Sequence, residues 1–571
     1  MKRYFLTLIL SGIIFQFFGQ AGKNIVYERV YLQTDKQLYL SGEQIQLKLF
    51  TVDAERIPVV FSKIAYAELV DDTIARIQIK VSLINGIGAG RMELPTDLPT
   101  GIYRLIAYTQ YMRNESVEVF FEKNICVVNT FQSGYYPNEA YLGNDVQGAG
   151  NDVQGTRNGM QGVVLRPDKT TYSTREHGEL TVSGLPDNIH TLSVSISGNE
   201  QIIDNKTIQL FIPHKPTTFS GECLPEYEGH ILTGKVIDNQ TGKVIDNQTR
   251  ITLFNNPSFT TGLAFPGNKI RFFTGQKTKT GDVRFFTSGI AGTKNVATVI
   301  YNADEKYRVE IISPYITHYA PTNRPILRID SSFYKQILVR SVALQILHYF
   351  ANDSENTHII QASNFKTIPT NSYLLEEYTR FTTMEDVFSE FIINARFRRK
   401  NGKWELSVLV KKGTSANFST NPLVLLDGVP ISNHELIYNY DPLLVEQINI
   451  YNDIFHFGDQ TFEGIIELKT YRGQVQDINF GKETQIIPYE GPQLYHQQFN
   501  PDYAIVKNRT NRMPDSRHTL LWNPYLQTER KSVVSIPFDT SDLLGDYQAT
   551  IEGITKTGEI IYSTIFLKVE K

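Results

Sequence analysis

The stretch YLQTDKQLYLSGEQIQLKLFTVD, residues 31–53, decides the fold of the first unit of this chain. Apolar and polar residues alternate along its second half, which is the period of a half-buried β-strand. Ser41-Gly42-Glu43 interrupts the alternation with a tight turn between two strands. Similar alternating segments, separated by turn residues, recur up to about residue 130. The pattern predicts a β-sandwich over residues 24–130.

The composition fits a folded, mainly β protein with several domains. The 571 residues are 41% hydrophobic and 20% charged, and 31 Tyr and 33 Phe against 6 Met favour strands over helices. The formal net charge is −4, and we find no block of like charge that suggests a polyanion. Charge therefore gives no basis for binding nucleic acid.

Residues 1–21 have the features of a signal peptide. A basic start, Lys2-Arg3, precedes an apolar run over residues 4–18, and small residues follow at Gly19 and Ala21. A run of this length falls short of the roughly 20 residues needed to span a bilayer. The sequence predicts an exported protein of the periplasm or the outer membrane.

The two cysteines, Cys126 and Cys223, allow two interpretations in an exported protein. One is a disulfide between two β-domains, which an oxidising compartment permits. The other, which we favour, is a pair of buried free thiols. Two cysteines cannot by themselves complete a structural zinc site.

The first sandwich carries a family resemblance. Asp35-Lys36, Tyr39 and Gly42-Glu43, with Leu98–Tyr103 later, resemble the opening and closing phrases of a macroglobulin domain of the alpha-macroglobulin family. The resemblance implies a fold and no chemistry. Members that trap proteinases covalently use a Cys–Gln thioester in a Gly-Cys-Gly-Glu-Gln phrase, and neither cysteine here has that context.

Two further sandwiches are predicted after a linker. Residues 131–160 form a Gly- and Asn-rich linker that contains a phrase copied in tandem at 143–155. Residues 161–222 repeat the Asp-Lys…Tyr phrase and predict a second, smaller macroglobulin-like sandwich. Residues 226–317 resemble the carboxypeptidase regulatory-like, transthyretin-type sandwich. A phrase duplicated at 233–248 suggests an insertion tolerated in loops.

A change of period marks a helical connection over residues 318–372. Within it, residues 331–347 repeat apolar residues at four-residue steps, at Tyr334, Leu338, Val342 and Ile346, with Phe333 and Ile337 beside them. This spacing predicts an amphipathic helix that packs against its neighbours.

Residues 373–475 mix helices and strands. Thr382 and Glu385 form a predicted capping box, and Asp427-Gly428 supplies a turn with positive φ. The phrases PLVLLDGVP, DPLLVEQINI and GIIELKT follow in an order that resembles the plug domain of TonB-dependent outer-membrane receptors. The whole order resembles Bacteroidota-type exported proteins that join macroglobulin and receptor-plug modules.

The plug resemblance does not imply a transporter. A receptor plug sits inside a barrel of about 22 strands, each of about ten residues, and the 96 residues after residue 475 cannot form one. Residues 476–571 instead predict a C-terminal β-sandwich of macroglobulin type. The plug-like unit is therefore expected to act as a scaffold or a docking element.

We predict no catalytic, cofactor-binding or metal site. The sequence has no His-Glu-x-x-His, Gly-x-Ser-x-Gly or phosphate-loop motif, and its 11 His are scattered. Asp427, Asp441 and Asp542 occupy turns or helix starts, where such side chains cap backbone donors. His456 and His496 are expected to be ordinary surface or packed residues. No catalytic residue is expected, so the protein is predicted not to be an enzyme.

The leading functional hypothesis is a non-enzymatic, exported scaffold that docks on an outer-membrane β-barrel protein or assembly, without a small-molecule cofactor. Its best structural markers are the turn Asp427-Gly428 and the loop Phe455–Gly458. The alternative is a macroglobulin-like proteinase-binding protein without the thioester. It would need an exposed bait segment, for which residues 143–155 are the candidate.

Overall fold

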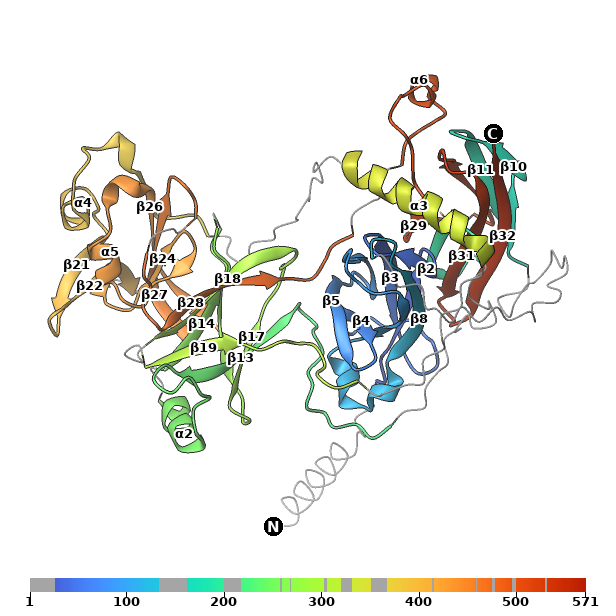
Figure 1. Cartoon of the computed structure of the whole chain (residues 1–571). Helices are drawn as coiled ribbons and strands as arrows, with labels where there is room; N and C mark the ends of the chain where they lie inside the picture. The colour runs from blue at the N-terminus through green and yellow to red at the C-terminus, as the bar shows by residue number, and fades with distance from the viewer. Residues whose placement is uncertain are drawn as a thin grey trace, which may run out of the picture.

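The computed structural model describes four folded units, whose arrangement Figure 1 shows. Together the described residues form eight β-sheets. Among them, no helix combines the length and the apolar character that crossing a lipid bilayer requires. The predicted signal peptide and the copied phrase at 143–155 lie outside the described residues. The described residues are 26–132, 162–199, 217–256, 259–267, 269–301, 306–319, 331–350, 367–412, 415–458, 460–474, 478–495, 500–528 and 531–571.

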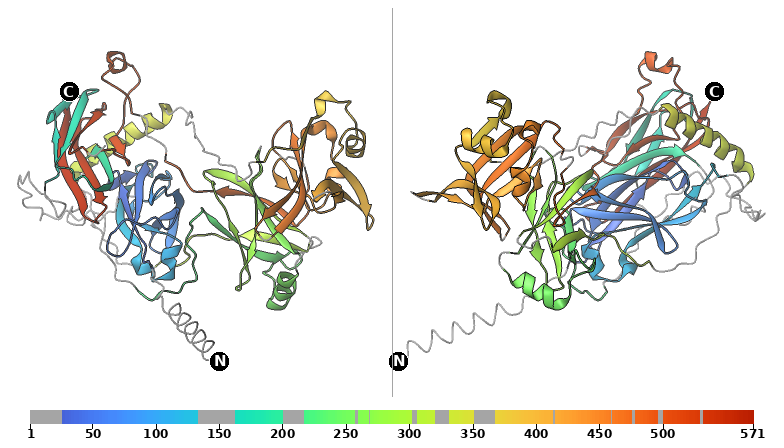
Figure 2. Two further views of the ribbon diagram at one scale, coloured as in Figure 1. Left: turned by 180° about the vertical axis from the view of Figure 1, so that it is seen from behind. Right: turned by 60° about the vertical axis from the view of Figure 1, so that its left-hand side comes forward.

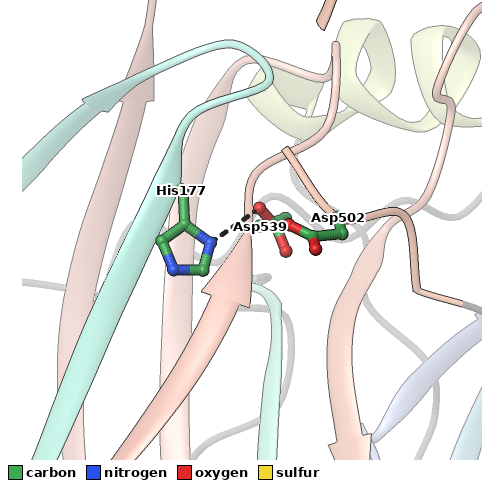
Figure 3. Close-up of side chains that lie close together, drawn as sticks. All are labelled: His177, Asp502 and Asp539. Carbon is green, nitrogen blue, oxygen red and sulfur yellow. Dashed lines mark hydrogen bonds and ion pairs between the residues drawn. The ribbon is translucent and has the colours of Figure 1, made fainter. Parts of the chain in front are cut away.

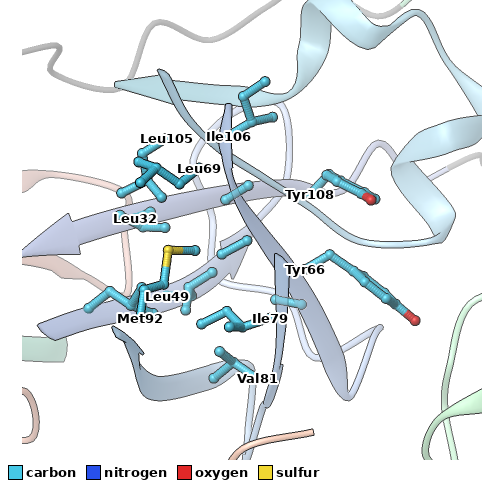
Figure 4. Close-up of a cluster of buried hydrophobic side chains, with 14 of the residues drawn as sticks. Leu32, Leu49, Tyr66, Leu69, Ile79, Val81, Met92, Leu105, Ile106 and Tyr108 are labelled. Atoms are coloured by element: carbon cyan, nitrogen blue, oxygen red, sulfur yellow. The ribbon is translucent and has the colours of Figure 1, made fainter. Parts of the chain in front are cut away.

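The N-terminal sandwich packs two sheets face to face. One sheet has the order β1-β3-β6 and the other β2-β8-β7-β4-β5. Its core is built from apolar residues of both inner faces, such as Leu49, Leu69 and Leu105 (Figure 4). The strands are β1 Arg29–Thr34, β2 Leu38–Leu40, β3 Gln44–Val52, β4 Ile64–Asp71, β5 Ile74–Ser82, β6 Ile87–Glu93, β7 Gly101–Tyr108 and β8 Phe121–Val128.

The Asp-Lys…Tyr phrase is a hydrogen-bonded device at the start of this sandwich. The carboxylate of Asp35 accepts hydrogen bonds from the Tyr39 hydroxyl at 2.7 Å and from the Gln46 amide at 3.1 Å. The carboxylate of Glu43 caps the same turn by accepting from the Leu40 amide at 3.2 Å. The residues that carry the family resemblance therefore fix the turns that connect β1, β2 and β3.

The second sandwich is composite, because its strands come from two distant parts of the chain. Its sheets have the orders β10-β32-β31-β12-β29 and β30-β11-β9. Figure 1 shows the two parts side by side, in teal and dark red. The strands are β9 Val164–Pro167, β10 Thr171–Ser173, β11 His177–Ser183, β12 Ile189–Gly198, β29 Thr519–Asn523, β30 Val533–Asp539, β31 Gly545–Thr555 and β32 Ile560–Glu570.

The predicted division into separate sandwiches at 161–222 and 476–571 is therefore wrong. One core joins Leu180 and Val194 from the first segment to Ile551 and Leu567 from the second. Neither segment can cover its own apolar faces, so each completes the other. The alternation of residues predicted the strands but carried no information on which strands pair.

The central sandwich also recruits a distant strand. Its sheets have the orders β16-β17-β13-β19 and β15-β14-β18-β28, and β28 (Thr484–Glu490) comes from beyond the predicted 226–317 unit. β18 and β28 are antiparallel, with Thr293 opposite Glu490. The other elements are β13 Ile231–Asp238, α2 Asn247–Asn255, β14 Thr260–Ala264, β15 Phe272–Thr274, β16 Gln276–Lys277, β17 Asp282–Phe286, β18 Thr293–Tyr301 and β19 Tyr307–Ile311.

The duplicated phrase at 233–248 was expected to lie in loops, but it lies only partly in loops. Its first copy forms most of β13, whereas its second copy makes a turn and enters α2 behind the N-cap Asp246. One sequence thus adopts two structures. Tertiary position overrides local preference because only the first copy has a strand partner on both sides, β17 and β19.

Residues 371–470 form an α+β unit with two sheets, of order β20-β26-β27-β24-β25 and β21-β22-β23. Helices α4 and α5 pack on the same core as the sheets, with Met384 and Ile437 buried. The elements are β20 Asn371–Leu374, α4 Met384–Glu390, β21 Ala395–Lys400, β22 Lys403–Lys412, β23 Ser415–Ser419, β24 Leu423–Leu426, β25 Val429–Pro430, α5 Glu435–Tyr438, β26 Val445–Phe457 and β27 Gln460–Thr470.

Helix α3 (Ser331–Phe350) confirms the predicted helix but only part of its predicted buried face. Ile337 packs against the N-terminal sandwich as expected, together with Leu344, whereas Leu338 and Val342 are exposed. The reason is a buried ion pair, in which the Arg340 guanidinium donates to Glu43 at 2.6 and 2.7 Å. A sequence pattern of apolar residues could not reveal this charged anchor.

Candidate functional site

The turn Asp427-Gly428 lies at an internal joint and not on a free surface. Both residues have positive φ, 48° and 79°, as predicted. The buried carboxylate of Asp427 accepts from the Thr470 amide and hydroxyl, each at 2.7 Å. The Asp427 carbonyl accepts from the Gly267 amide of the central sandwich at 2.8 Å. This turn therefore holds the α+β unit to its neighbour.

The loop Phe455–Gly458 lies at the same joint. Phe272 of the central sandwich makes edge-to-face contacts with Phe457 and Phe462, with ring centroids 5.3 and 5.6 Å apart. The Phe457 carbonyl accepts from the Thr274 hydroxyl at 2.5 Å. Both predicted structural markers thus lie where the α+β unit contacts the central sandwich.

A buried polar network joins the central sandwich to the N-terminal one. His230 Nδ1 lies 2.8 Å from the Glu226 carboxylate, and its Nε2 is hydrogen-bonded to the Tyr489 hydroxyl. Tyr66, on β4, donates to the same carboxylate at 3.1 Å. Glu226, His230 and Tyr489 line a cavity of about 180 Å³ together with Cys223. Because these polar groups hydrogen-bond to one another, the network connects the two sandwiches.

A second polar joint connects the N-terminal and composite sandwiches. The Thr519 hydroxyl donates to Asp35 at 2.8 Å, and the Ser193 hydroxyl donates to Gln33 at 2.7 Å. Tyr31 on β1 is hydrogen-bonded to Glu552 on β31. The cleft between the two sandwiches encloses about 110 Å³. The Asp-Lys…Tyr phrase thus both closes its own turn and contacts the next unit.

Buried Lys48 lies beneath this joint. Its side chain is fully buried, and its amine is without a hydrogen-bond partner among the described residues. Burial lowers the pKa of Lys48 to about 7, against the opposing influence of Glu552. A buried amine that titrates near neutrality makes this part of the molecule sensitive to pH.

Figure 3 shows a possible metal-ligating group that sequence spacing could not reveal. His177 on β11 and Asp539 on β30 are cross-strand partners, and His177 Nδ1 lies 3.0 Å from the Asp539 carboxylate. One oxygen of Asp502 joins them, with all three ligand atoms within 4.8 Å of one another. One imidazole and two carboxylates suit Zn²⁺. The Tyr503 amide also donates to Asp539 at 3.0 Å, so the group already forms a hydrogen-bonded clasp.

The two cysteines are free, as favoured from the sequence, but only Cys126 is buried, whereas Cys223 is partly exposed. Cys126 is buried beneath α3, in a cluster with Ile337 and Leu344. Burial raises the pKa of the Cys223 thiol. Both residues therefore have the environment of structural thiols.

The other predicted capping residues are mostly confirmed. Asp441 accepts from the Leu443 amide at 2.9 Å, and Asp542 accepts from the Asp515 amide at 2.9 Å. The predicted capping box at Thr382 is displaced by one residue, because Thr383 accepts from the Asp386 amide at 3.2 Å. His456 is hydrogen-bonded to Thr461 on the exposed hairpin, and His496 lies outside the described residues.

The α+β unit carries a half-exposed apolar patch near the end of β27. Leu443, Leu444 and Tyr471 are each about half exposed. Arg380 holds them together, since its guanidinium donates to the Pro442 carbonyl at 2.9 Å and to the Tyr471 hydroxyl at 3.2 Å. We call Leu443, Leu444 and Tyr471 the rim patch.

No protein-family model matches the chain, and no curated protein matches it. Among solved structures, it is similar to alpha-2-macroglobulin of Salmonella reacted with methylamine, with 8% identity and a TM-score of 0.24. The match to the native E. coli alpha-2-macroglobulin has 10% identity and a TM-score of 0.23. The match to the Yersinia pseudotuberculosis adhesin InvE has 8% identity and a TM-score of 0.13. The matches cover 95%, 97% and 50% of this chain and 40%, 40% and 58% of those chains.

The chain therefore spans about 40% of the length of the macroglobulins it resembles. Its own sheets define its class as a mainly β protein of several sandwich-like units.

Proposed function

We propose that this protein is an exported, non-enzymatic scaffold that docks on an outer-membrane β-barrel protein. In this proposal the α+β unit is a plug-like docking element, and the sandwiches hold it at a fixed distance from the rest of the chain. Export rests on the predicted signal peptide, and the plug-like identity rests on the phrases of residues 422–470.

One observation carries the proposal: the α+β unit is fixed to the central sandwich by one face and leaves the rim patch exposed. The joint buries aromatic residues from both partners, including Phe272 and Phe462. A cluster of exposed apolar side chains on a soluble surface is a common mark of an interaction site. The rim patch is therefore the surface on which we expect a barrel protein to bind.

Affinity purification from detergent-solubilised outer membranes tests the proposal. The tagged protein should recover a barrel protein, and the triple variant Leu443→Ser, Leu444→Ser and Tyr471→Ser should lose it. A matched control replaces exposed apolar residues elsewhere, Val244→Ser and Ile251→Ser, and should keep it. Recovery of no barrel protein by the unmodified protein would refute the proposal.

A further inference from the structure

The β21–β22 hairpin is strongly basic, which corrects the expectation that the chain has no block of like charge. Residues 395–412 contain seven Lys or Arg residues and one acidic residue, Glu405, for a net charge of +6 in a chain whose total is −4. Figures 1 and 2 show the hairpin at the end of the molecule far from the N-terminal sandwich. The charge is therefore concentrated at one extremity.

The strand register places five of the seven basic residues on one face. Phe397 pairs with Leu406 across the hairpin, and both contribute to the core of the unit. Because side chains alternate along a strand, Arg396, Arg398 and Lys400 point to the opposite face. All three residues are exposed. Lys403 and Lys411, on the same face of β22, are exposed as well.

The basic face is held rigidly. The guanidinium groups of Arg396 and Arg398 lie over the Phe418 ring of β23, at 3.7 and 5.2 Å from its centroid. Asn401 and Gly402 close the hairpin with φ values of 50° and 81°, which suit a tight two-residue turn. The charges therefore form a preorganised platform and not a flexible tail.

Few carboxylates oppose this platform. Glu405 lies 3.6 Å from the Lys400 amine and neutralises one charge. On the neighbouring helix α4, Glu385 already accepts from the Tyr438 hydroxyl, and Asp386 accepts from Thr383. Glu390, the remaining acidic residue of α4, is exposed. The hairpin thus keeps a positive surface after its nearest acidic groups are counted.

We propose that the outward face of the β21–β22 hairpin binds the phosphate headgroups of an anionic lipid surface. Arginine forks bind phosphate oxygens in a bidentate manner, and a sheet face matches a flat array of phosphates. The inference rests on the proposed function, because that function brings the chain to a membrane. The hairpin would then orient the α+β unit while the rim patch contacts the barrel protein.

Vesicle co-sedimentation of the full chain without residues 1–21 tests the inference. The probes are vesicles of phosphatidylglycerol mixed with phosphatidylcholine, and vesicles of phosphatidylcholine alone. The unmodified protein should bind only the anionic vesicles, and added salt should weaken the binding. The triple variant Arg396→Thr, Arg398→Thr and Lys400→Thr should bind about a hundredfold more weakly. Threonine is chosen because it suits a strand.

A matched control removes the same charge from exposed sites elsewhere, through Lys243→Thr, Lys279→Thr and Lys482→Thr, and should bind like the unmodified protein. Equal loss in the control would show that total charge alone matters and would overturn the inference. Absence of vesicle binding by the unmodified protein, or binding to polyglutamate in place of vesicles, would also overturn it. Vesicle binding that persists although no barrel protein is recovered from membranes would refute the proposed function alone.

Discussion

Arg175 offers a direct test of how the composite sandwich is assembled. Its φ of 53° is left-handed, a conformation that costs a residue with a side chain about 1 kcal/mol. The matching position in the first sandwich is Gly42, with φ of 90°. The Asp-Lys…Tyr…Glu phrase has the same spacing in both sandwiches, and Asp168 accepts from Tyr172 at 2.7 Å, as Asp35 does from Tyr39.

The guanidinium of Arg175 explains why this strain is tolerated. It donates to both oxygens of Asp542 at 2.7 Å and to the Met513 carbonyl at 2.8 Å. Burial raises the pKa of Asp542, but the hydrogen bonds from Arg175 and the Asp515 amide, together with the charges of Arg175 and Arg517, leave that pKa below its usual value. After discounting for partial exposure, these charge-assisted bonds contribute about 2 kcal/mol. Arg175 thus ties the first chain segment of the sandwich to the second.

Replacing Arg175 by Ala and by Gly separates the two effects. Arg175→Ala loses the bonds and keeps the strain, so we expect a loss of about 2 kcal/mol in unfolding free energy. Arg175→Gly loses the same bonds but relieves the strain, so its loss should be about 1 kcal/mol smaller. The control Gly42→Ala should cost about 1 kcal/mol through strain alone, because a Cβ there meets no atom closer than 3.4 Å.

Urea unfolding followed by the fluorescence of Trp522 measures these differences. The chain has two Trp residues, so a Trp404→Phe background leaves Trp522, which is buried in the composite sandwich, as the single reporter. Unchanged stability in Arg175→Ala would show that the guanidinium contributes nothing. A Gly variant no more stable than the Ala variant would contradict the assignment of strain to this position.

Three other perturbations test the joints. Lys48→Met should stabilise the protein by up to about 4 kcal/mol at pH 7. The Lys48 amine has a pKa of about 7 in the folded protein and 10.5 in the unfolded chain, so the stability of the unmodified protein should rise with pH between these values. Urea unfolding at several pH values should show that the variant has lost this dependence. Glu43→Gln should leave Arg340 buried without its charge partner, cost about 3–5 kcal/mol, and increase hydrogen exchange in α3, whereas Lys335→Gln on the exposed side of that helix should not. Removing divalent metal with a chelator should not change the melting temperature, because hydrogen bonds already join His177 to Asp539; a fall on chelation that Zn²⁺ reverses would establish a metal centre instead.

Local sequence signals predicted strands well and their partners poorly. The turn at Asp427-Gly428, the N-cap at Asp441 and the helix over residues 331–347 follow from residue types within a few positions of each other. Each depends on steric or hydrogen-bonding preferences that act along the chain. The pairing of β12 with β31 joins residues 349 to 366 positions apart, and no spacing rule contains it.

The candidate surfaces show the same limit. The clasp of His177, Asp502 and Asp539 has no sequence signature, because its members meet only when the composite sandwich closes. The basic hairpin was visible as RFRRKNGK at residues 396–403, but a net charge taken over the whole chain concealed it. The buried face of α3 was misjudged because Arg340, a charged residue, occupies it. Burial of a charge depends on a partner that the local pattern does not contain.

The order of the units along the chain gives the joints their importance. The composite sandwich opens at Val164 and closes at Glu570, and the central sandwich opens at Ile231 and closes at Glu490. In sequence, the α+β unit is therefore inserted between strands of the central sandwich, and the central sandwich is inserted between strands of the composite one. Pairing strands so distant in sequence carries a large loop-closure cost that only the completed sheets can offset.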